Sequence, residues 1–174
     1  MMKKDLIDPK DIDLILNTHC HPDHCESNEI FSKISGARIG MHEIEANYLK
    51  NDARLLYEIF NFPFPDFKID LCLKNSLKLN NSEIEIIHTP GHSPGSVCLY
   101  FNEDKTLICG DLIFERSFGR TDLPGGEPTL IKKSIERISN LDIELLLPGH
   151  GNFIKGKKNV RNNFDFIKKI LNYV

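Results

Sequence analysis

The stretch Thr18-His19-Cys20-His21-Pro22-Asp23-His24 places four potential metal ligands within six residues, directly after a short apolar run. Imidazole nitrogens and a carboxylate oxygen together suit zinc, iron or manganese. In an extended segment the side chains of His19 and His21 project to the same side, so both can reach one ion. Asp23 and His24 lie past the bend, where they can face a second ion. The alternative interpretation is a polar surface turn.

Three further polar residues follow predicted strands, in loops that contain Gly and Pro: His92, Asp111 and His150. Rigid loops at strand ends are where proteins commonly present functional groups. Taken alone, Gly110-Asp111 and Pro148-Gly149-His150 are more typical of simple turns. Together with the first stretch, however, they bring the number of candidate ligands to seven, which suits two metal ions.

Length and charge exclude several classes of protein. A chain of 174 residues predicts a single domain over residues 1–174. The 22 Lys and Arg residues against 25 Asp and Glu residues give a net charge of −3, without the basic excess expected of a nucleic-acid-binding domain. No apolar run approaches the roughly 20 residues of a membrane span, and residues 1–9 hold no apolar signal core.

The cysteines indicate a reducing compartment. Five cysteines are an odd number, in a chain too long for a small disulfide-stapled scaffold. We therefore expect them to be reduced and the protein to be cytoplasmic, with a small-molecule substrate and neither nucleic acid nor membrane as a partner.

Hydrophobic patterning predicts a layered α/β architecture, because strands dominate the middle of the chain and amphipathic helices alternate with strands at both ends. The predicted strands are 11–17, 37–41, 76–79, 83–88, 96–101, 106–109 and 144–147. The predicted helices are 28–34, 43–60 with a break near Asn51-Asp52, 127–141 and 160–174. The segment 61–67 is too rich in proline and phenylalanine for a regular helix.

Four segments resemble, in chain order, the metal motifs of the metallo-β-lactamase superfamily: Thr18–His24, Thr89–His92, Gly110-Asp111 and Pro148–Gly151. Gly119-Arg120-Thr121-Asp122 and the Gly-rich loop after it resemble the glyoxalase II-like (hydroxyacylglutathione hydrolase-like) branch of that superfamily. The resemblance covers nearly the whole chain. It implies an α/β, four-layer αββα sandwich with the metals at one edge, between the two sheets.

The resemblance also implies a role for each candidate ligand. His19, His21 and His92 would bind one metal, Asp23, His24 and His150 would bind the other, and Asp111 would bridge them. The implied protein is a binuclear metal-dependent hydrolase of a small thioester or ester. Two divalent ions, zinc in preference to iron or manganese, would share a hydroxide that attacks the carbonyl carbon. Asp23 would also orient this nucleophile.

Two departures from the family pattern keep other interpretations open. Only 18 residues precede His19, so part of the first sheet is expected to be missing, and pairing with a second chain would cover its edge in a homodimer. A single predicted helix follows Pro148–Gly151, where glyoxalase II enzymes carry a helical domain that holds glutathione. The alternatives are a mononuclear iron enzyme resembling persulfide dioxygenases, and a metal-binding but inactive fragment.

Four lesser features each allow two interpretations. His42 either rims the pocket or begins a helix, and His88 is either structural or supports His92. Arg120-Thr121-Asp122 either shapes the pocket or ties its loop to the metal ligands. The aromatic side chains of 60–67 either form a wall over the substrate or simply pack against the sandwich.

Overall fold

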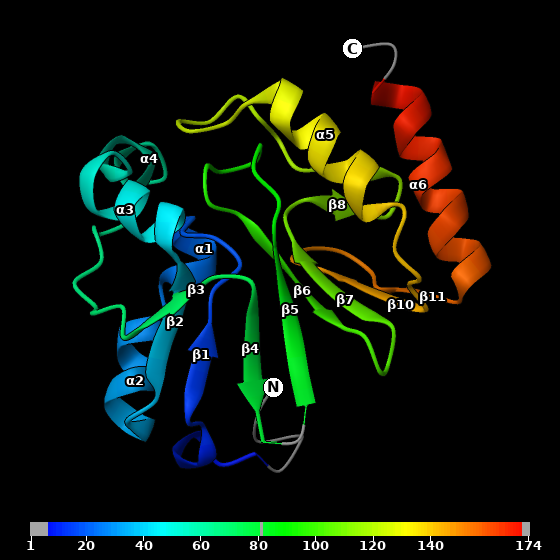
Figure 1. The fold of residues 1–174 in the computed structure, drawn as a ribbon. Helices are drawn as coiled ribbons and strands as arrows, with labels where there is room; N and C mark the ends of the chain where they lie inside the picture. The colour runs from blue at the N-terminus through cyan, green and yellow to red at the C-terminus, as the bar shows by residue number, and fades with distance from the viewer. Residues whose placement is uncertain (1–6, 81, 172–174) are drawn as a thin grey trace.

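The computed structural model describes residues 7–80 and 82–171, and their strands form two sheets with a shared apolar core between them (Figure 1). The smaller sheet is parallel, with the order β1-β2-β3. The larger sheet has the order β11-β10-β7-β6-β5-β4. The strands of the smaller sheet are β1 (Leu14–Leu16), β2 (Arg38–His42) and β3 (Leu71–Leu73). Those of the larger sheet are β4 (Ser76–Leu79), β5 (Ser82–His88), β6 (Val97–Phe101), β7 (Thr106–Gly110), β10 (Leu145–Pro148) and β11 (Ile154–Lys155). A separate hairpin joins β8 (Ile113–Phe114) to β9 (Ser117–Phe118).

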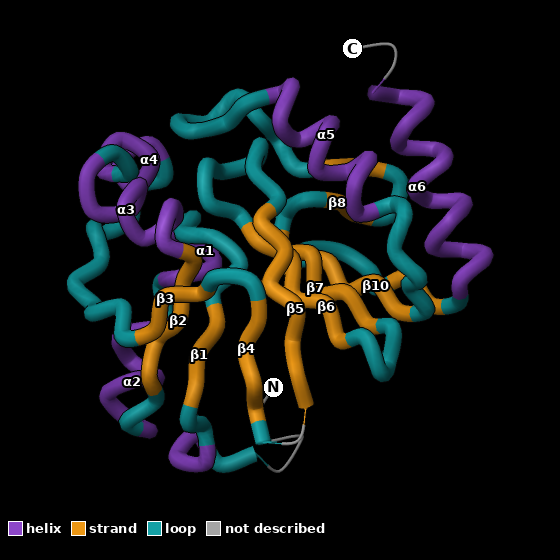
Figure 2. Tube along the Cα trace, viewed as in Figure 1, coloured by secondary structure: helices purple, strands orange, loops and turns teal. Residues whose placement is uncertain are grey.

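Helices cover the outer side of each sheet, as Figures 1 and 2 show. One group lies beside the smaller sheet: the 3-10 helix η2 (Pro9–Asp11), α1 (Pro22–Cys25), α2 (Asn28–Ser35), α3 (Glu43–Asn51) and α4 (Arg54–Ile59). The other group, α5 (Pro128–Ile138) and α6 (Lys157–Leu171), packs on the larger sheet. The described residues therefore form the α/β, four-layer αββα sandwich that the sequence predicts.

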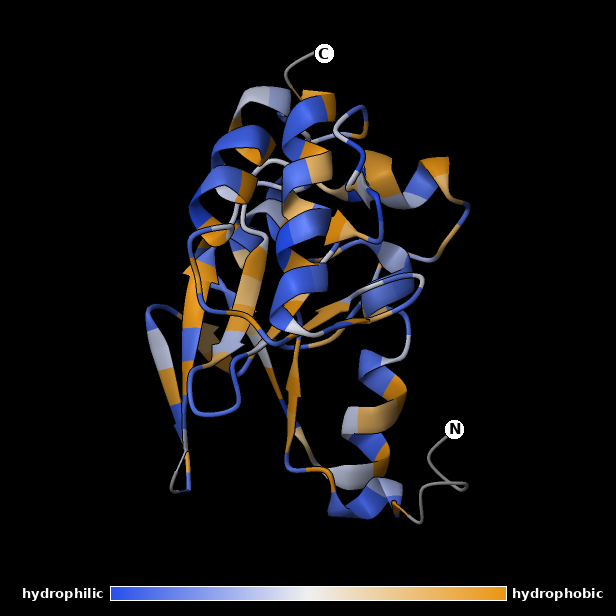
Figure 3. Ribbon diagram, turned by 90° about the vertical axis from the view of Figure 1, so that its right-hand side faces the viewer, coloured by the Kyte–Doolittle hydropathy of each residue, from blue (hydrophilic) through white to orange (hydrophobic). Residues whose placement is uncertain are grey.

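The core follows from the periodicity of the sequence. In β5, Ile84 and Ile86 are buried between the sheets while Glu83 and Glu85 alternate outward to solvent. The buried stripes of α5 and α6 pack against the larger sheet, and the outer faces of these helices, seen in Figure 3, are largely hydrophilic. Within the described ranges, no helix is long and apolar enough to cross a bilayer.

Most of the predicted elements are confirmed, with shifts at their ends. The predicted break in 43–60 separates α3 from α4, and the predicted strands 76–79 and 83–88 pair as β4 and β5. The prediction of a strand over 11–17 is wrong at its start, because Asp8 caps a 3-10 turn at Pro9–Asp11. The final helix begins at Lys157, and residues 172–174 of its predicted range lie outside the described residues. The sequence did not predict β3, β8, β9 or β11, each two or three residues long.

Candidate metal centre

All seven candidate ligands lie together in the structure, in the segments that follow strands. His19 to His24 follow β1, His92 lies between β5 and β6, Asp111 follows β7 and His150 follows β10. Three overlapping sets have ligand atoms within 4.8 Å of one another: His19/His21/His92, Asp23/His24/His150 and His19/His24/Asp111. The first two sets, which we call the first group and the second group, are those that the family resemblance implies.

The first group consists of three buried imidazoles. The ring centroids of His19 and His21 are 4.6 Å apart, and those of His21 and His92 are 4.3 Å apart. The buried Nε2 atoms of all three have no hydrogen-bond partner among the described residues. A buried polar atom without a partner is costly, and three that converge suit a shared cation. The residues present therefore fit a metal ion.

Hydrogen bonds on the opposite ring nitrogens orient two of these imidazoles. His92 Nδ1 donates to the backbone carbonyl of Arg120 at 2.8 Å, and His19 Nδ1 lies 3.1 Å from Thr18 Oγ1. Burial lowers the pKa of His19 and His92, and it lowers the pKa of His21 to about 3. All three are therefore neutral near pH 7, which is the form that binds a metal.

The second group is more open to solvent. His150 Nε2 lies 3.0 Å from Asp23 Oδ2 and 3.2 Å from His24 Nε2. Burial opposes the protonation of His24, but its hydrogen bond with Asp111 and the nearby carboxylates outweigh burial, so the pKa of His24 is raised. This group combines one carboxylate and two imidazoles, a donor set that suits a divalent transition metal.

The carboxylate of Asp111 lies between the two groups. Its Oδ1 is 3.3 Å from His24 Nε2, and its Oδ2 is 3.6 Å from His92 Nε2 and 3.4 Å from His150 Nε2. Burial alone would raise the pKa of Asp111, but the hydrogen bond with His24 and the surrounding imidazoles lower it. Asp111 thus presents one oxygen toward a ligand of the second group and the other toward ligands of both groups.

Local sequence explains how the first loop is held. Pro22 begins α1, which suits its fixed backbone angle, and this short helix carries Asp23 and His24. The buried side chain of Asn17 donates to the carbonyl of His24 at 3.1 Å and accepts from Asn28 at 2.8 Å. These hydrogen bonds tie the end of β1 to α1 and α2.

Gly149 allows the second group to approach Asp111. A Cβ atom at this position would lie 2.2 Å from Asp111 Oδ1 and 2.8 Å from His24 Cε1. We expect Gly149→Ala to displace both side chains and to lower metal affinity about tenfold or more, as loss of ligand orientation does in other metal sites. Competition with a chromogenic chelator measures this effect. Unchanged affinity in a folded variant would show that the loop adjusts without moving Asp111.

Glu45 is a residue of this site that the sequence analysis missed. Its side chain is 0% exposed, and its two carboxyl oxygens accept hydrogen bonds from the backbone N–H groups of Cys20 (2.8 Å) and Gly95 (2.7 Å). Cys20 lies between His19 and His21, and Gly95 closes the loop that carries His92. One side chain of α3 therefore connects the two loops of the first group.

An apolar cavity of about 460 Å³ lies beside the candidate ligands. Phe60 and Phe62 line it, whereas Phe64 and Phe67 pack against the core cluster around Met41. The packing interpretation therefore holds for Phe64 and Phe67, and a wall over the substrate stays a prediction for Phe60 and Phe62. Arg120 likewise has two roles: its side chain lines the cavity and its backbone carbonyl holds His92.

His42 and His88 lie outside the cavity lining. His42 caps α3, accepting a hydrogen bond from Ile44 N at 3.3 Å, and its ring stacks on that of His88 at 4.6 Å. His88 Nε2 lies 2.9 Å from the carbonyl oxygen of Pro94. The helix-start interpretation of His42 is therefore confirmed, and His88 contacts the loop that carries His92 without contacting His92 itself.

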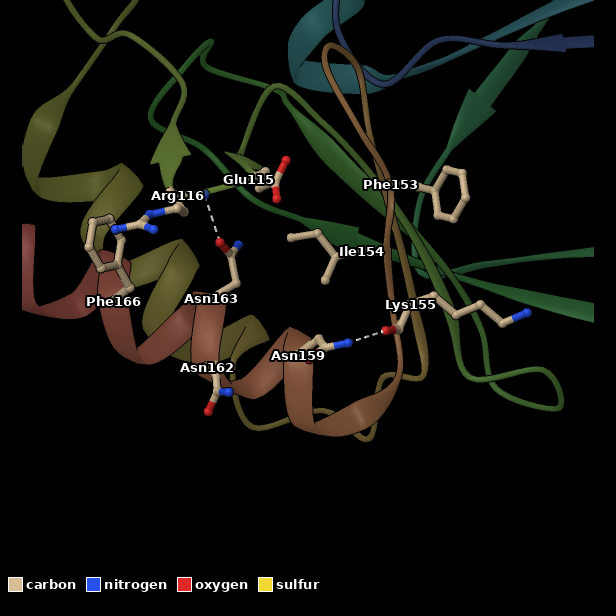
Figure 4. Close-up of a pocket in the computed structure, with 9 residues that line it drawn as sticks. All are labelled: Glu115, Arg116, Phe153, Ile154, Lys155, Asn159, Asn162, Asn163 and Phe166. Atoms are coloured by element: carbon tan, nitrogen blue, oxygen red, sulfur yellow. Dashed lines mark hydrogen bonds between the residues drawn. The ribbon is translucent and has the colours of Figure 1, made fainter.

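A second cavity, of about 470 Å³, lies between α6, β11 and the β8–β9 turn (Figure 4). None of its lining residues is a candidate ligand, and it shares no lining residue with the apolar cavity. Two of its polar side chains have partners within the lining: Asn163 accepts from the backbone N–H of Arg116, and Asn159 donates to the carbonyl of Lys155. The chemistry of the candidate ligands is thus confined to the first cavity.

An αββα sandwich with this cluster of histidine and aspartate residues at its strand ends defines a class of metal-binding proteins, and sequence comparison places the chain within it. The sequence pattern of the Metallo-beta-lactamase superfamily matches residues 2–150. The chain belongs to this superfamily.

Individual relatives agree with this membership. The chain is 37% identical over 148 residues to "Probable metallo-hydrolase MJ0888" of Methanocaldococcus jannaschii, covering 82% of this chain and 71% of that protein. It is 29% identical to "Hydroxyacylglutathione hydrolase GloC" of Haemophilus influenzae over 86% of this chain and 74% of that protein. Among solved structures, TTHA1623 "in a di-iron-bound form" is similar with a TM-score of 0.74 at 29% identity, over 88% of this chain and 76% of that one.

Proposed function

We propose that this protein is a binuclear metal-dependent hydrolase that acts on a small thioester or ester. One observation carries the proposal: seven side chains that could bind metal lie together, with Asp111 close to both groups, beside an apolar cavity. Among its described lining residues, this cavity has no Ser, Thr, Cys or Lys that could act as a nucleophile. Water is therefore the nucleophile that the site supports best.

In this reaction the side chains of the protein would position the metal ions and the attacking water. Two divalent ions, when bound, lower the pKa of a shared water and polarise the carbonyl group of the substrate. His19, His21 and His92 would hold one ion, Asp23, His24 and His150 the other, and Asp111 both. Asp23, whose side chain is 52% exposed, faces the open side of the site, where it can orient the attacking water. The water oxygen bonds to the carbonyl carbon and the carbon–sulfur bond breaks, giving a carboxylate, a thiol and a proton.

The glyoxalase II-like branch is the part of the superfamily that we propose. The Gly119–Asp122 segment and the similarity to GloC support it, and Arg120 of this segment contacts both His92 and the cavity. The complete Asp23/His24/His150 group favours two ions over the mononuclear iron alternative. Nitrogen and oxygen ligands suit zinc, while the di-iron form of TTHA1623 keeps iron as an alternative metal.

Metal analysis paired with a thioester-hydrolysis assay on the same preparation tests the proposal. We expect about two ions per chain, turnover that chelation removes, and recovery when zinc, iron or manganese is added back. One iron per chain without hydrolysis would favour the oxygenase. Two ions without turnover of any thioester, ester or lactone would favour an inactive metal-binding protein.

Two expectations about the cellular context stay predictions. The five cysteines form no disulfide in the structure, which is compatible with the cytoplasmic location that we propose. A homodimer is likewise a proposal, and the molar mass from light scattering tests it.

A further inference from the structure

Four of the residues that line the cavity beside the candidate ligands are phenylalanines, which we call the phenylalanine wall. Phe60 and Phe62 follow α4, Phe114 lies in β8, and Phe118 lies in β9. Leu123 adds to the same lining. Segments that lie about 50 residues apart in the sequence thus contribute hydrocarbon side chains to the same cavity as the candidate ligands. Contact with such side chains favours apolar substrate groups, because burial of apolar surface away from water is favourable.

The same lining contains few charged side chains that could pair with a charged substrate group. Beyond the candidate ligands, Arg120 is the one charged side chain among the described lining residues. Its guanidinium already donates two hydrogen bonds to the carboxylate of Asp122, Nε to Oδ1 at 2.8 Å and Nη2 to Oδ2 at 2.7 Å. This bidentate pair uses two of the five N–H donors of the guanidinium and places the negative charge of Asp122 beside the remaining ones. A second carboxylate near Arg120 would have to compete with Asp122.

The cavity of Figure 4 does not supply a second cation for a substrate carboxylate at the ligand site. The guanidinium of Arg116 lies over the ring of Phe166, 4.5 Å from its centroid, and faces the cavity of Figure 4. That cavity has a lining of its own, separate from the ligand site. A substrate group bound beside the candidate ligands would therefore contact the phenylalanine wall and the Arg120–Asp122 ion pair.

We infer that the substrate carries an uncharged hydrocarbon or aryl group next to the scissile bond, and that substrates with carboxylate-bearing groups there, including glutathione thioesters, are used poorly. This inference rests on the proposed hydrolase function. Each methylene that becomes buried contributes about 0.8 kcal/mol, which corresponds to about a fourfold gain in affinity at full burial. The hydrocarbon group belongs either to the acyl half or to the leaving group, and two substrate series distinguish these sources.

In the first series, the thiol is constant and the acyl group varies. Acetyl, butyryl, phenylacetyl and succinyl thioesters of N-acetylcysteamine are compared by kcat/KM with the zinc-loaded protein. Butyryl and succinyl groups have the same number of carbon atoms, so they differ mainly in the terminal carboxylate. We expect kcat/KM to rise two- to fourfold per methylene from acetyl to butyryl, and butyryl to exceed succinyl about tenfold or more.

In the second series, the butyryl group is constant and the thiol is either N-acetylcysteamine or glutathione. A preference of about tenfold or more for the neutral thiol, without dependence on the acyl group, would place the hydrocarbon requirement on the leaving group. Dependence on the acyl group alone would place it on the acyl half. If the two series show no preference, or if the succinyl and glutathione substrates are preferred, the inference is wrong while the hydrolase proposal stands. Absence of turnover throughout would instead refute the hydrolase proposal, and the inference would fall with it.

Substitutions in the wall connect the selectivity to particular residues. Phe62 is 36% exposed, so its replacement is not expected to unfold the protein. We expect Phe62→Ala to reduce the butyryl-to-acetyl ratio, and Phe62→Arg to raise the use of succinyl thioesters relative to butyryl thioesters. Ile59→Ala is the matched control, because Ile59 is an exposed apolar residue close in sequence that does not line the cavity. Equal effects of the Phe62 and Ile59 substitutions would overturn the assignment of the wall.

A binding measurement gives a readout that is independent of turnover. Calorimetric titration of the zinc-loaded protein with phenylacetate and with succinate compares an aryl carboxylate with a dicarboxylate. We expect phenylacetate to bind more tightly, and Phe62→Ala to remove most of the difference. Tighter binding of succinate would contradict the inference even if both thioester series were hydrolysed.

Discussion

Replacing Asp111 by asparagine is expected to abolish hydrolysis and to reduce the metal content from about two ions per chain to one or fewer. The carboxylate of Asp111 lies close to ligands from both groups, at 3.3 Å from His24 and 3.6 Å from His92. Asparagine keeps the shape of the side chain but removes its charge and one acceptor oxygen. Because a bound metal contributes several kcal/mol to transition-state stabilisation, kcat/KM should fall about a thousandfold or more.

The control for this substitution is Asp104→Asn. Asp104 is an exposed aspartate in the turn between β6 and β7, in the same sheet and remote from the candidate ligands. Asp104→Asn should retain both metals and full turnover. The metal-free forms of both variants should melt close to the metal-free parent, since neither substitution leaves a cavity. Two tightly bound ions in a folded Asp111→Asn protein would contradict the bridging role that we propose.

The sequence predicted that these seven side chains lie together, because the relevant information is concentrated in a few residues. Four of the seven candidate ligands lie within Thr18–His24, where alternation along an extended chain already places His19 and His21 on one side. His92, Asp111 and His150 are each weak signals on their own, because a Gly or Pro next to a polar residue is common in turns. Only the order of the four motifs, through the family resemblance, indicated that they meet.

The remaining features depend on tertiary contacts that no local pattern encodes. Strands β8 and β9 have two residues each, so hydrophobic periodicity cannot detect them, yet they carry two of the four phenylalanines of the cavity wall. Phe60 and Phe62 meet these residues only after folding. Glu45 is one of 25 acidic residues, on a helix predicted correctly, and nothing nearby in the sequence marks it as buried.

Glu45 is the one of these features whose role follows from its burial. A fully buried carboxyl group is costly unless charged or hydrogen-bonding groups compensate for its lost hydration. Its partners are two backbone N–H groups, those of Cys20 and Gly95. Gly95 is needed for this approach: a Cβ atom there would lie 2.1 Å from the backbone nitrogen of Glu45. Since Cys20 and Gly95 belong to the two loops that carry His19, His21 and His92, Glu45 fixes the spacing between these loops. It is a positioning residue and does not line the cavity.

We expect Glu45→Gln and Glu45→Ala to weaken metal binding in graded order. Alanine leaves two buried N–H groups without acceptors, and each such group costs about 1–3 kcal/mol, so the free energy of unfolding should fall by about 2–6 kcal/mol. Glutamine retains one acceptor oxygen and turns its NH₂ group toward the other N–H, so its effect on stability should be smaller. Metal affinity should fall about 10- to 100-fold in Glu45→Gln, comparable to the loss of other groups that orient metal ligands.

Glu43→Gln is the matched control, because Glu43 lies two residues earlier in the same helix and is exposed. Chelator competition on folded protein measures affinity, denaturant unfolding of the metal-free protein measures stability, and the absorption spectrum of the cobalt-substituted protein reports ligand geometry. A positioning role predicts a changed cobalt spectrum and weaker affinity in Glu45→Gln under conditions where the metal-free variant is fully folded. If stability falls while the affinity and spectrum of the folded protein match those of Glu43→Gln, then Glu45 stabilises the two loops without determining how their histidines meet a metal.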